Sequence, residues 1–226
     1  MGTLYVVSTP IGNLEDITLR VLRISKEVDL ILCEDTRVTQ KLLQHYQIKT
    51  STLSYHEHSK LNKIDYILEL LKNGKNLALV SDAGTPGISD PGGKLIQRVV
   101  ESLSDKVEII PIPGPSAVTA AASIFGFPTN KFLFLGFPPT KRKRKFFFEE
   151  IMNSKYPVIF YESRYRILKT LNELRIMNKE LRIVVCRELT KKFETIYRGE
   201  IEAVIKKLES DKNNLRGEFV VVINHG

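Results

Sequence analysis

The sequence is organised around a glycine- and proline-rich stretch at residues 81–93, SDAGTPGISDPGG. The apolar run at residues 77–80 before it is typical of a buried strand, and the apolar spacing within residues 95–100 after it predicts an amphipathic helix. The stretch is longer than an ordinary strand-to-helix turn. Its glycines allow a backbone to come close to a ligand, and its prolines stiffen the loop.

Ligands of open α/β sheets bind outside the carboxyl ends of the strands, so we interpret residues 81–93 as a loop that cradles a ligand rather than a plain surface loop. Lys94 is followed by Leu95, which removes the hydroxyl of a phosphate-binding P-loop, and no dinucleotide fingerprint is present. Asp82 and Asp90 would repel a polyphosphate. Backbone groups with carboxylates suit a neutral or cationic ligand, such as S-adenosylmethionine.

Two other predicted strand ends in the first half carry polar or rigid residues. Pro10 and Gly12 follow a strand at residues 4–8, and Asn13 is placed to cap the next helix. Residues 34–37, EDTR, follow a strand at residues 30–33. These residues are either part of a site or an ordinary helix cap, and the sequence leaves both interpretations open.

The alternation of strands and helices predicts an α/β protein with two domains, residues 1–125 and 126–226. The first half reads as repeated strand–helix units, which implies a mainly parallel sheet. The second half also alternates but predicts a mixed sheet, with strands at residues 131–136, 158–161, 183–186, 195–197 and 219–223.

Charge is shared unevenly between the two halves. Residues 1–125 hold 13 Lys and Arg against 14 Asp and Glu, a net charge of −1, whereas residues 126–226 hold 21 against 12, a net charge of +9. Such asymmetry indicates a polyanionic partner that is met mainly by the second half.

A run of five basic residues is the clearest local source of that charge. The run is followed by three phenylalanines, and the two together favour contact with nucleic-acid phosphates over a simple solvated loop. Its members are Lys141, Arg142, Lys143, Arg144 and Lys145.

Several other classes of protein are disfavoured. No apolar run is long enough to span a membrane, and the first residues carry no targeting signal, so we expect a cytoplasmic protein. Cys33 and Cys186 lie in apolar strand-like runs and are expected to be reduced. His56 and His58 are spaced as possible metal ligands, but too few partners remain for a full set, so we expect no metal.

The motifs together resemble the ribosomal RNA small subunit methyltransferase I family, a branch of the tetrapyrrole (corrin/porphyrin) methylase superfamily. The resemblance covers nearly the whole chain and is carried by residues 4–14, 34–37, 81–93, 112–117, 160–163 and 187–191. It implies a two-domain tetrapyrrole methylase-like fold that binds S-adenosylmethionine in the cleft between the domains, usually as a homodimer. It also implies 2′-O-methylation of a cytidine ribose in 16S rRNA, at the decoding centre of the small ribosomal subunit.

The resemblance also implies which residues line the cofactor. The matching positions are Pro10, Ala83, Gly84, Thr85, Ile88, Ser116, Ala117 and Tyr161. Many members of the family continue beyond the last strand into a helical tail, whereas this sequence stops at Gly226. We therefore expect RNA contacts of that tail to be made elsewhere in this chain.

Methyl transfer to a ribose hydroxyl needs a group that takes the hydroxyl proton. The candidates are acids just past predicted strands, namely Glu34, Asp35, Asp82, Glu162 and Glu188, and the sequence does not choose among them. Two other functions remain as alternatives. A tetrapyrrole or corrin methylase would leave the basic half without a use, and a non-catalytic RNA-binding module would not need the glycine-rich loop.

Overall fold

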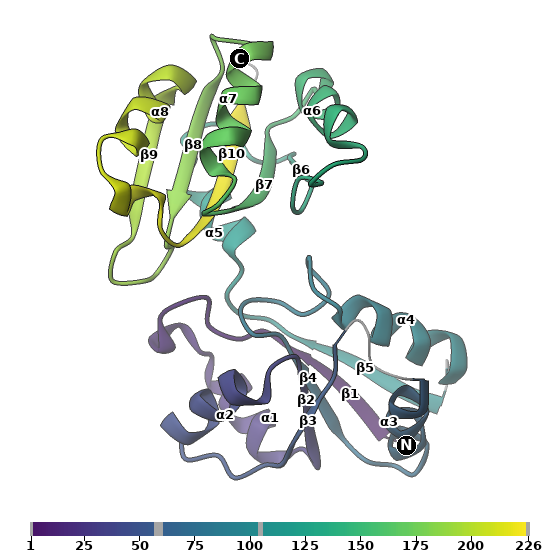
Figure 1. Ribbon diagram of the computed structural model, residues 1–226. Coiled ribbons are helices and arrows are strands. Elements are labelled where there is room, and N and C mark those ends of the chain that lie inside the picture. Colours follow the sequence, from purple (N-terminus) through teal and green to yellow (C-terminus); the bar gives the residue numbers. More distant parts are fainter. Residues whose placement is uncertain (1, 57–60, 104–105, 225–226) are drawn as a thin grey trace. The chain divides into compact units, whose positions relative to one another are not determined.

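The computed structural model describes residues 2–56, 61–103 and 106–224, which form two compact units, Met1–Ser116 and Ala117–Gly226. Each unit contains one five-stranded sheet (Figure 1). The sequence-based boundary after residue 125 differs from this division. The reason is that helix α5 (Ala117–Ser123) packs on strands β7 (Val158–Ser163) and β10 (Glu218–Asn224) of the second unit, so the structure groups it with that unit.

The first unit holds a fully parallel sheet. Its strands are arranged in the order β3-β2-β4-β1-β5, and every neighbouring pair runs in the same direction. The carboxyl ends of all five strands therefore lie along one edge of the sheet. The strands are β1 (Gly2–Val7), β2 (Leu30–Cys33), β3 (Thr52–Ser54), β4 (Leu77–Val80) and β5 (Val107–Ile112).

Helices cover both faces of the first sheet (Figure 1). Val21 of α1 and Leu43 of α2 pack in one buried cluster, whereas Leu71 of α3 and Leu95 of α4 pack in another. Each helix has the amphipathic spacing that lets one apolar side pack against the sheet. The helices are α1 (Leu19–Glu27), α2 (Thr36–His45), α3 (Leu61–Lys72) and α4 (Gly92–Leu103).

The second unit holds a mixed sheet in the order β6-β7-β10-β8-β9. β6 is parallel to β7, while β7 and β8 are both antiparallel to β10 and so point in the same direction. The carboxyl ends of β6, β7 and β8 therefore share one edge. The strands are β6 (Leu133–Phe134), β7 (Val158–Ser163), β8 (Arg182–Arg187), β9 (Thr195–Glu200) and β10 (Glu218–Asn224).

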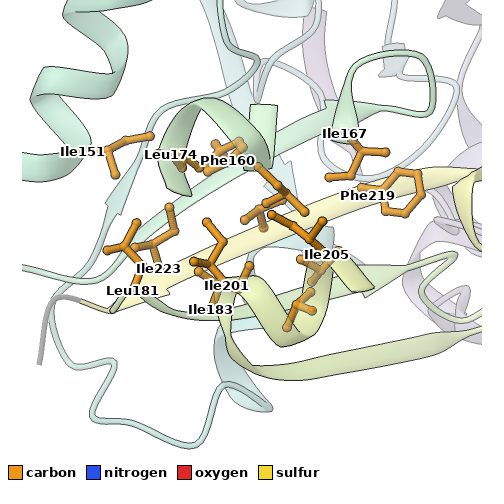
Figure 2. Packing of buried hydrophobic residues seen from close by; sticks show 14 of the residues in the cluster. Ile151, Phe160, Ile167, Leu174, Leu181, Ile183, Ile201, Ile205, Phe219 and Ile223 are labelled. Atoms are coloured by element: carbon orange, nitrogen blue, oxygen red, sulfur yellow. The ribbon is translucent and has the colours of Figure 1, made fainter. Parts of the chain in front are cut away.

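Three helices, α6 (Arg144–Asn153), α7 (Ile167–Met177) and α8 (Ile201–Glu209), share one buried cluster with the second sheet. Figure 2 shows this packing, in which Phe160 and Phe219 of the sheet lie among apolar side chains of the helices. The predicted α/β class, with a mainly parallel first sheet and a mixed second sheet, is confirmed.

A buried polar network ties α7 to its surroundings in the second unit. The Thr170 hydroxyl donates to Glu162 Oε2 at 2.6 Å and accepts from Arg144 Nη2 at 2.8 Å. Thr170 is 0% exposed and Glu162 is 1% exposed. This single hydroxyl therefore links a buried carboxylate to a buried guanidinium. Buried charged groups need such hydrogen-bonded partners, because burial without them is costly.

The same network holds the loop between β6 and α6. Arg144 Nη1 donates to the carbonyl of Pro139 at 3.0 Å, and Arg166 Nη1 donates to the carbonyl of Pro138 at 2.9 Å. Arg166 also forms an ion pair with Glu162 at 3.0 Å. The loop is therefore fixed to α7 by two arginines.

Within the described residues, no helix combines the length and the apolar character needed to cross a membrane. Cys33 and Cys186 are buried and unbridged. Of the two histidines considered as metal ligands, His56 is described, while His58 lies outside the described residues.

Replacing Thr170 with Val should lower the free energy of unfolding by about 3 kcal/mol, because a side chain of similar shape would leave Glu162 and Arg144 without their shared partner. Thr170→Ser keeps the hydroxyl and is the matched control. Urea unfolding of both variants measures the difference. Equal stability of the two variants would show that the network contributes little.

Candidate functional site

The first sheet has a topological switch point at the carboxyl ends of β1 and β4. These strands are neighbours, but the chain leaves β1 towards α1 and leaves β4 towards α4, and the two helices cover opposite faces. Diverging loops open a crevice at such a point, where ligands of parallel α/β sheets bind. Residues 81–91 form the loop that leaves β4 at this point, where the sequence predicted a ligand-binding loop.

The loops at this point are joined to each other by short contacts. Thr9 N donates to Gly84 O at 2.9 Å, and Gly84 N donates to Thr9 O at 3.1 Å. The Thr9 hydroxyl also donates to the carbonyl of Ser81 at 3.0 Å. Sequence reasoning missed Thr9, although it lies in the segment after the first strand that was recognised. Its buried side chain fixes the start of the glycine-rich loop.

The hydroxyls of Ser8 and Thr85 connect the loops after β1 and β4 to the loop after β5. Ser8 Oγ and Thr85 Oγ1 lie 3.0 Å apart, and Thr85 Oγ1 donates to the carbonyl of Pro115 at 3.3 Å. A Cβ at Gly114 would lie 3.0 Å from Ser8 Cβ. The three strand-end loops therefore form one closely packed rim.

Gly84 occupies a backbone conformation that suits glycine, with φ of +84°. A Cβ there would lie 3.4 Å from Ile11 Cγ2, which is an ordinary contact distance. The requirement for glycine at this position is therefore conformational and not steric. Replacement would strain the turn that carries the hydrogen bonds to Thr9.

Asp90 organises the second part of the loop. Its Oδ1 accepts from Gly87 N at 2.8 Å and from Gly92 N at 2.7 Å, and a Cβ at Gly92 would lie 2.9 Å from the same oxygen. Asp90 therefore folds the loop on itself, a role that the sequence did not reveal. Gly87 and Gly92 of the glycine-rich loop therefore serve the structure of the loop itself.

Three acidic candidates of the first unit lie at the carboxyl ends of β2 and β4. Asp82 Oδ1 accepts from Asp35 N at 3.1 Å. Asp35 caps α2 by accepting from Arg37 N at 2.8 Å, and the Arg37 guanidinium lowers the pKa of Asp35 to about 2. The helix-cap interpretation of this segment is therefore correct for Asp35.

Glu34 differs from Asp35 in its electrostatic environment. Burial raises the pKa of Glu34 above its usual value, and the nearby carboxylates of Asp82 and Asp90 raise it further. These three acids create a negative potential at the edge of the first sheet. Such a potential favours a cationic ligand.

The acids of the second unit are held by basic partners. Glu162 Oε1 accepts from Ser163 N at 2.7 Å and pairs with Arg166, while its other oxygen accepts from Thr170. Burial favours a raised pKa for Glu188, but Lys191 and the backbone of Glu218 outweigh it, and the pKa is lowered. Both acids therefore serve the structure of their loops, and their catalytic role stays a prediction without local support.

The basic run divides into one buried and four exposed residues. Arg144 is 9% exposed and its guanidinium contacts Glu173 at 2.8 Å in addition to Thr170 and Pro139. Contact of Arg144 with phosphate, as predicted from the sequence, is therefore not supported. The exposed members are Lys141, Arg142, Lys143 and Lys145.

The predicted cofactor-lining residues lie in both units. Most of them are on the rim of the first sheet, while Ala117 begins α5 and Tyr161 lies in β7, both in the second unit. The Tyr161 ring packs against Phe134 and Phe137 at centroid distances of 5.0 and 5.3 Å. The residues of the first-unit rim are Pro10, Ala83, Gly84, Thr85, Ile88 and Ser116.

Related sequences cover nearly all of this chain. The family model described as tetrapyrrole (corrin/porphyrin) methylases matches residues 3–205. A protein of Thermotoga maritima named ribosomal RNA small subunit methyltransferase I is 42% identical and covers 99% of this chain and 99% of its own length. Proteins of the same name from Halalkalibacterium halodurans and Synechocystis sp. are 43% and 44% identical, cover 98% and 99% of this chain, and are themselves covered over 75% and 79%.

Solved structures share the fold at much lower identity. Diphthine synthase matches with a TM-score of 0.74 at 14% identity, over 99% of this chain and 90% of that protein. The methyltransferase CobJ matches with a TM-score of 0.70 at 19% identity, over 99% and 94%. The chain therefore belongs to the tetrapyrrole (corrin/porphyrin) methylase family, in the branch of the ribosomal RNA small subunit methyltransferases I.

Proposed function

We propose that this protein uses S-adenosylmethionine to methylate the 2′-hydroxyl of a cytidine ribose in 16S rRNA, at the decoding centre of the small ribosomal subunit. The observation that carries the proposal is the identity of 42–44% to relatives named ribosomal RNA small subunit methyltransferase I, along nearly the whole chain. The cytidine and its 2′-oxygen follow from the resemblance of the motifs. We further propose that the protein acts in the cytoplasm as a homodimer.

S-adenosylmethionine is the cofactor of this family, and the first-unit rim fits it. The acidic edge formed by Glu34, Asp82 and Asp90 suits a molecule with a sulfonium and an ammonium group. The rim carries no side chain at Gly84, so a ligand can approach the loop backbone closely there. When bound, the cofactor supplies an electrophilic methyl group.

The residues of this chain must position the ribose hydroxyl and accept its proton. A carboxylate with a raised pKa is the better proton acceptor at neutral pH, because its basicity is closer to the operating pH. Among the five candidate acids, Glu34 combines a raised pKa with a place at the edge of the sheet, and Asp82 lies beside it. We therefore propose Glu34 as the proton acceptor.

The exposed members of the basic run are proposed to contact RNA phosphates. Arg144 presents them by anchoring the start of α6, and Lys143 precedes this helix with a positive φ of 64°. A tetrapyrrole acceptor would leave these exposed cations without a partner. Methyl-transfer assays that compare small ribosomal subunits with a tetrapyrrole, followed by nucleoside analysis for 2′-O-methylcytidine, test the proposal directly.

The role of the rim can be tested by comparing two glycines with nearly equal backbone conformations. Gly84 has φ of +84° at the rim, and Gly74 has φ of +81° at the end of α3 with no atom within 4 Å of an added Cβ. Alanine at either position should cost about 1–2 kcal/mol of stability. Only Gly84→Ala should weaken the thermal stabilisation that S-adenosylmethionine confers on the native state. An equal ligand-induced shift in both variants would show that the rim is misassigned.

Glu34→Gln should lower the single-turnover rate of methyl transfer at least tenfold while the affinity for S-adenosylmethionine is retained, because only the transfer of the proton is impaired. The wild-type rate should fall as the pH decreases through the raised pKa of Glu34, and this dependence should be lost in the variant. Weaker cofactor binding at an unchanged maximal rate would assign Glu34 to binding instead.

The stability of the same variant provides an independent check. Below the usual glutamate pKa of 4.5, both the folded and unfolded states hold the proton, and Glu34→Gln should match the wild type. As the pH rises through the raised pKa of the folded state, the wild type should lose stability relative to the variant. Thermal unfolding across this range measures the difference, and parallel curves would contradict a raised pKa.

Replacing Lys141, Arg142, Lys143 and Lys145 with glutamine should lower the affinity for small ribosomal subunits and flatten its salt dependence. Each lost phosphate contact should reduce the slope of log affinity against log salt by about 0.7 to 0.9. Arg144 is left in place because it is structural. Cofactor binding serves as the folding control, and an unchanged salt slope would mean that these side chains are only solvated.

A further inference from the structure

Two of the most exposed aromatic rings of the second unit lie in loops at the same edge of its sheet. Tyr165 is 80% exposed and follows the end of β7, and Phe193 is 63% exposed and follows the end of β8. Since β7 and β8 point in the same direction, both loops begin at their shared carboxyl edge.

Each ring is accompanied by the cationic side chain that precedes it. The Arg164 guanidinium lies 4.6 Å from the centre of the Tyr165 ring and also donates to the tyrosine hydroxyl. Lys192 Nζ lies 5.6 Å from the centre of the Phe193 ring. A ring that stacks on a base, beside a cation that meets a phosphate, is the recurring combination in proteins that bind single-stranded nucleic acid.

An arginine stabilises the loop at each ring, namely the half-buried Arg166 and the buried Arg187. Arg166, next to Tyr165, is held by Glu162 and by the carbonyl of Pro138. Arg187 is 8% exposed and donates to the carbonyl of Phe193 at 3.0 Å. The two turns are therefore ordered before a ligand arrives, which reduces the conformational cost of binding.

The charges at this edge favour RNA as the partner. The basic run follows β6, whose carboxyl end lies at the same edge because β6 is parallel to β7. The two acids of the loop that carries Phe193 are engaged, since Glu188 pairs with Lys191 and Glu194 accepts from Thr190 N. An acidic peptide would use the cations but would not require the two rings.

We propose that Tyr165 and Phe193 are stacking platforms for unpaired bases of the RNA substrate, with Arg164 and Lys192 meeting the adjacent phosphates. This inference rests on the proposed function and extends it to the kind of RNA that is bound, a single-stranded segment. The rings supply contacts to bases that the basic run, which meets phosphates alone, does not provide.

The test uses the full chain and unstructured RNA oligonucleotides of about ten nucleotides, a length within the usual range for single-strand sites. Tyr165→Ala and Phe193→Ala should each weaken binding about tenfold, with an unchanged salt slope because no phosphate contact is lost. Fluorescence of 2-aminopurine placed in the oligonucleotide should be quenched by the wild type and restored in the double variant. Tyr165→Phe and Phe193→Tyr should bind as the wild type does.

Tyr156→Ala is the matched control. Tyr156 is 45% exposed and also carries a cation, Lys131 at 5.6 Å, but it lies just before the start of β7, at the opposite edge. This variant should bind RNA normally. Equal losses in Tyr156→Ala and the edge variants would overturn the assignment of the edge, as would a ring dependence that is equally strong for duplex RNA or for oligoglutamate.

The outcomes separate this inference from the proposed function. If the wild type methylates small ribosomal subunits but the double variant binds the oligonucleotide as tightly as the wild type, the stacking proposal is overturned and the proposed function stands. If the wild type neither binds RNA nor methylates small subunits, the proposed function fails and the stacking surface fails with it.

Discussion

The parallel pairing of β1 with β4 is the constraint on which the candidate site of the first unit depends. Parallel strands need long crossovers, and here the crossovers leave these two neighbours towards opposite faces, so their end loops diverge. The reciprocal hydrogen bonds between Thr9 and Gly84 then join the two loops at the point of divergence. The joined loops form the backbone rim, and Glu34 and Asp82 bring negative charge to the ends of β2 and β4.

In the second unit, side chains instead of backbone groups hold a strand-end loop in place. Thr170 joins the carboxylate of Glu162 to the guanidinium of Arg144, and this network attaches the loop after β6 to α7. Removing one partner from such a network leaves a buried charge uncompensated, which costs more than the pair contributes. The loop that carries the exposed cations is thus fixed by buried ions, while Lys141 and Lys143 remain available to a partner.

The sequence predicted the fold class and the place of the glycine-rich loop because both depend on local pattern: apolar periodicity and the spacing of glycine and proline. It did not predict which charges are buried. Arg144 is one basic residue among five in the sequence, and its contacts with Thr170 and Glu173 on α7 make it structural. The sequence also did not predict where the first α-helix begins. Asn13, the expected cap, caps a short 3-10 helix (Leu14–Asp16), and Thr18 caps α1. Either residue type is a good cap, and tertiary packing decides where the helix begins.

A cationic methyl donor and a polyanionic acceptor make opposite demands on local electrostatic potential. A basic side chain beside Glu34 would lower its pKa and reduce its value as a proton acceptor, whereas acids within the basic run would weaken phosphate contact. The chain meets these demands by giving them to different units: Met1–Ser116 carries a net charge of −1 and Ala117–Gly226 carries +9. In the second unit, the acids Glu162 and Glu188 are paired with Arg166 and Lys191, which leaves the exposed cations to set the potential. The charge asymmetry of the sequence is therefore a consequence of the two ligands that we propose this protein brings together.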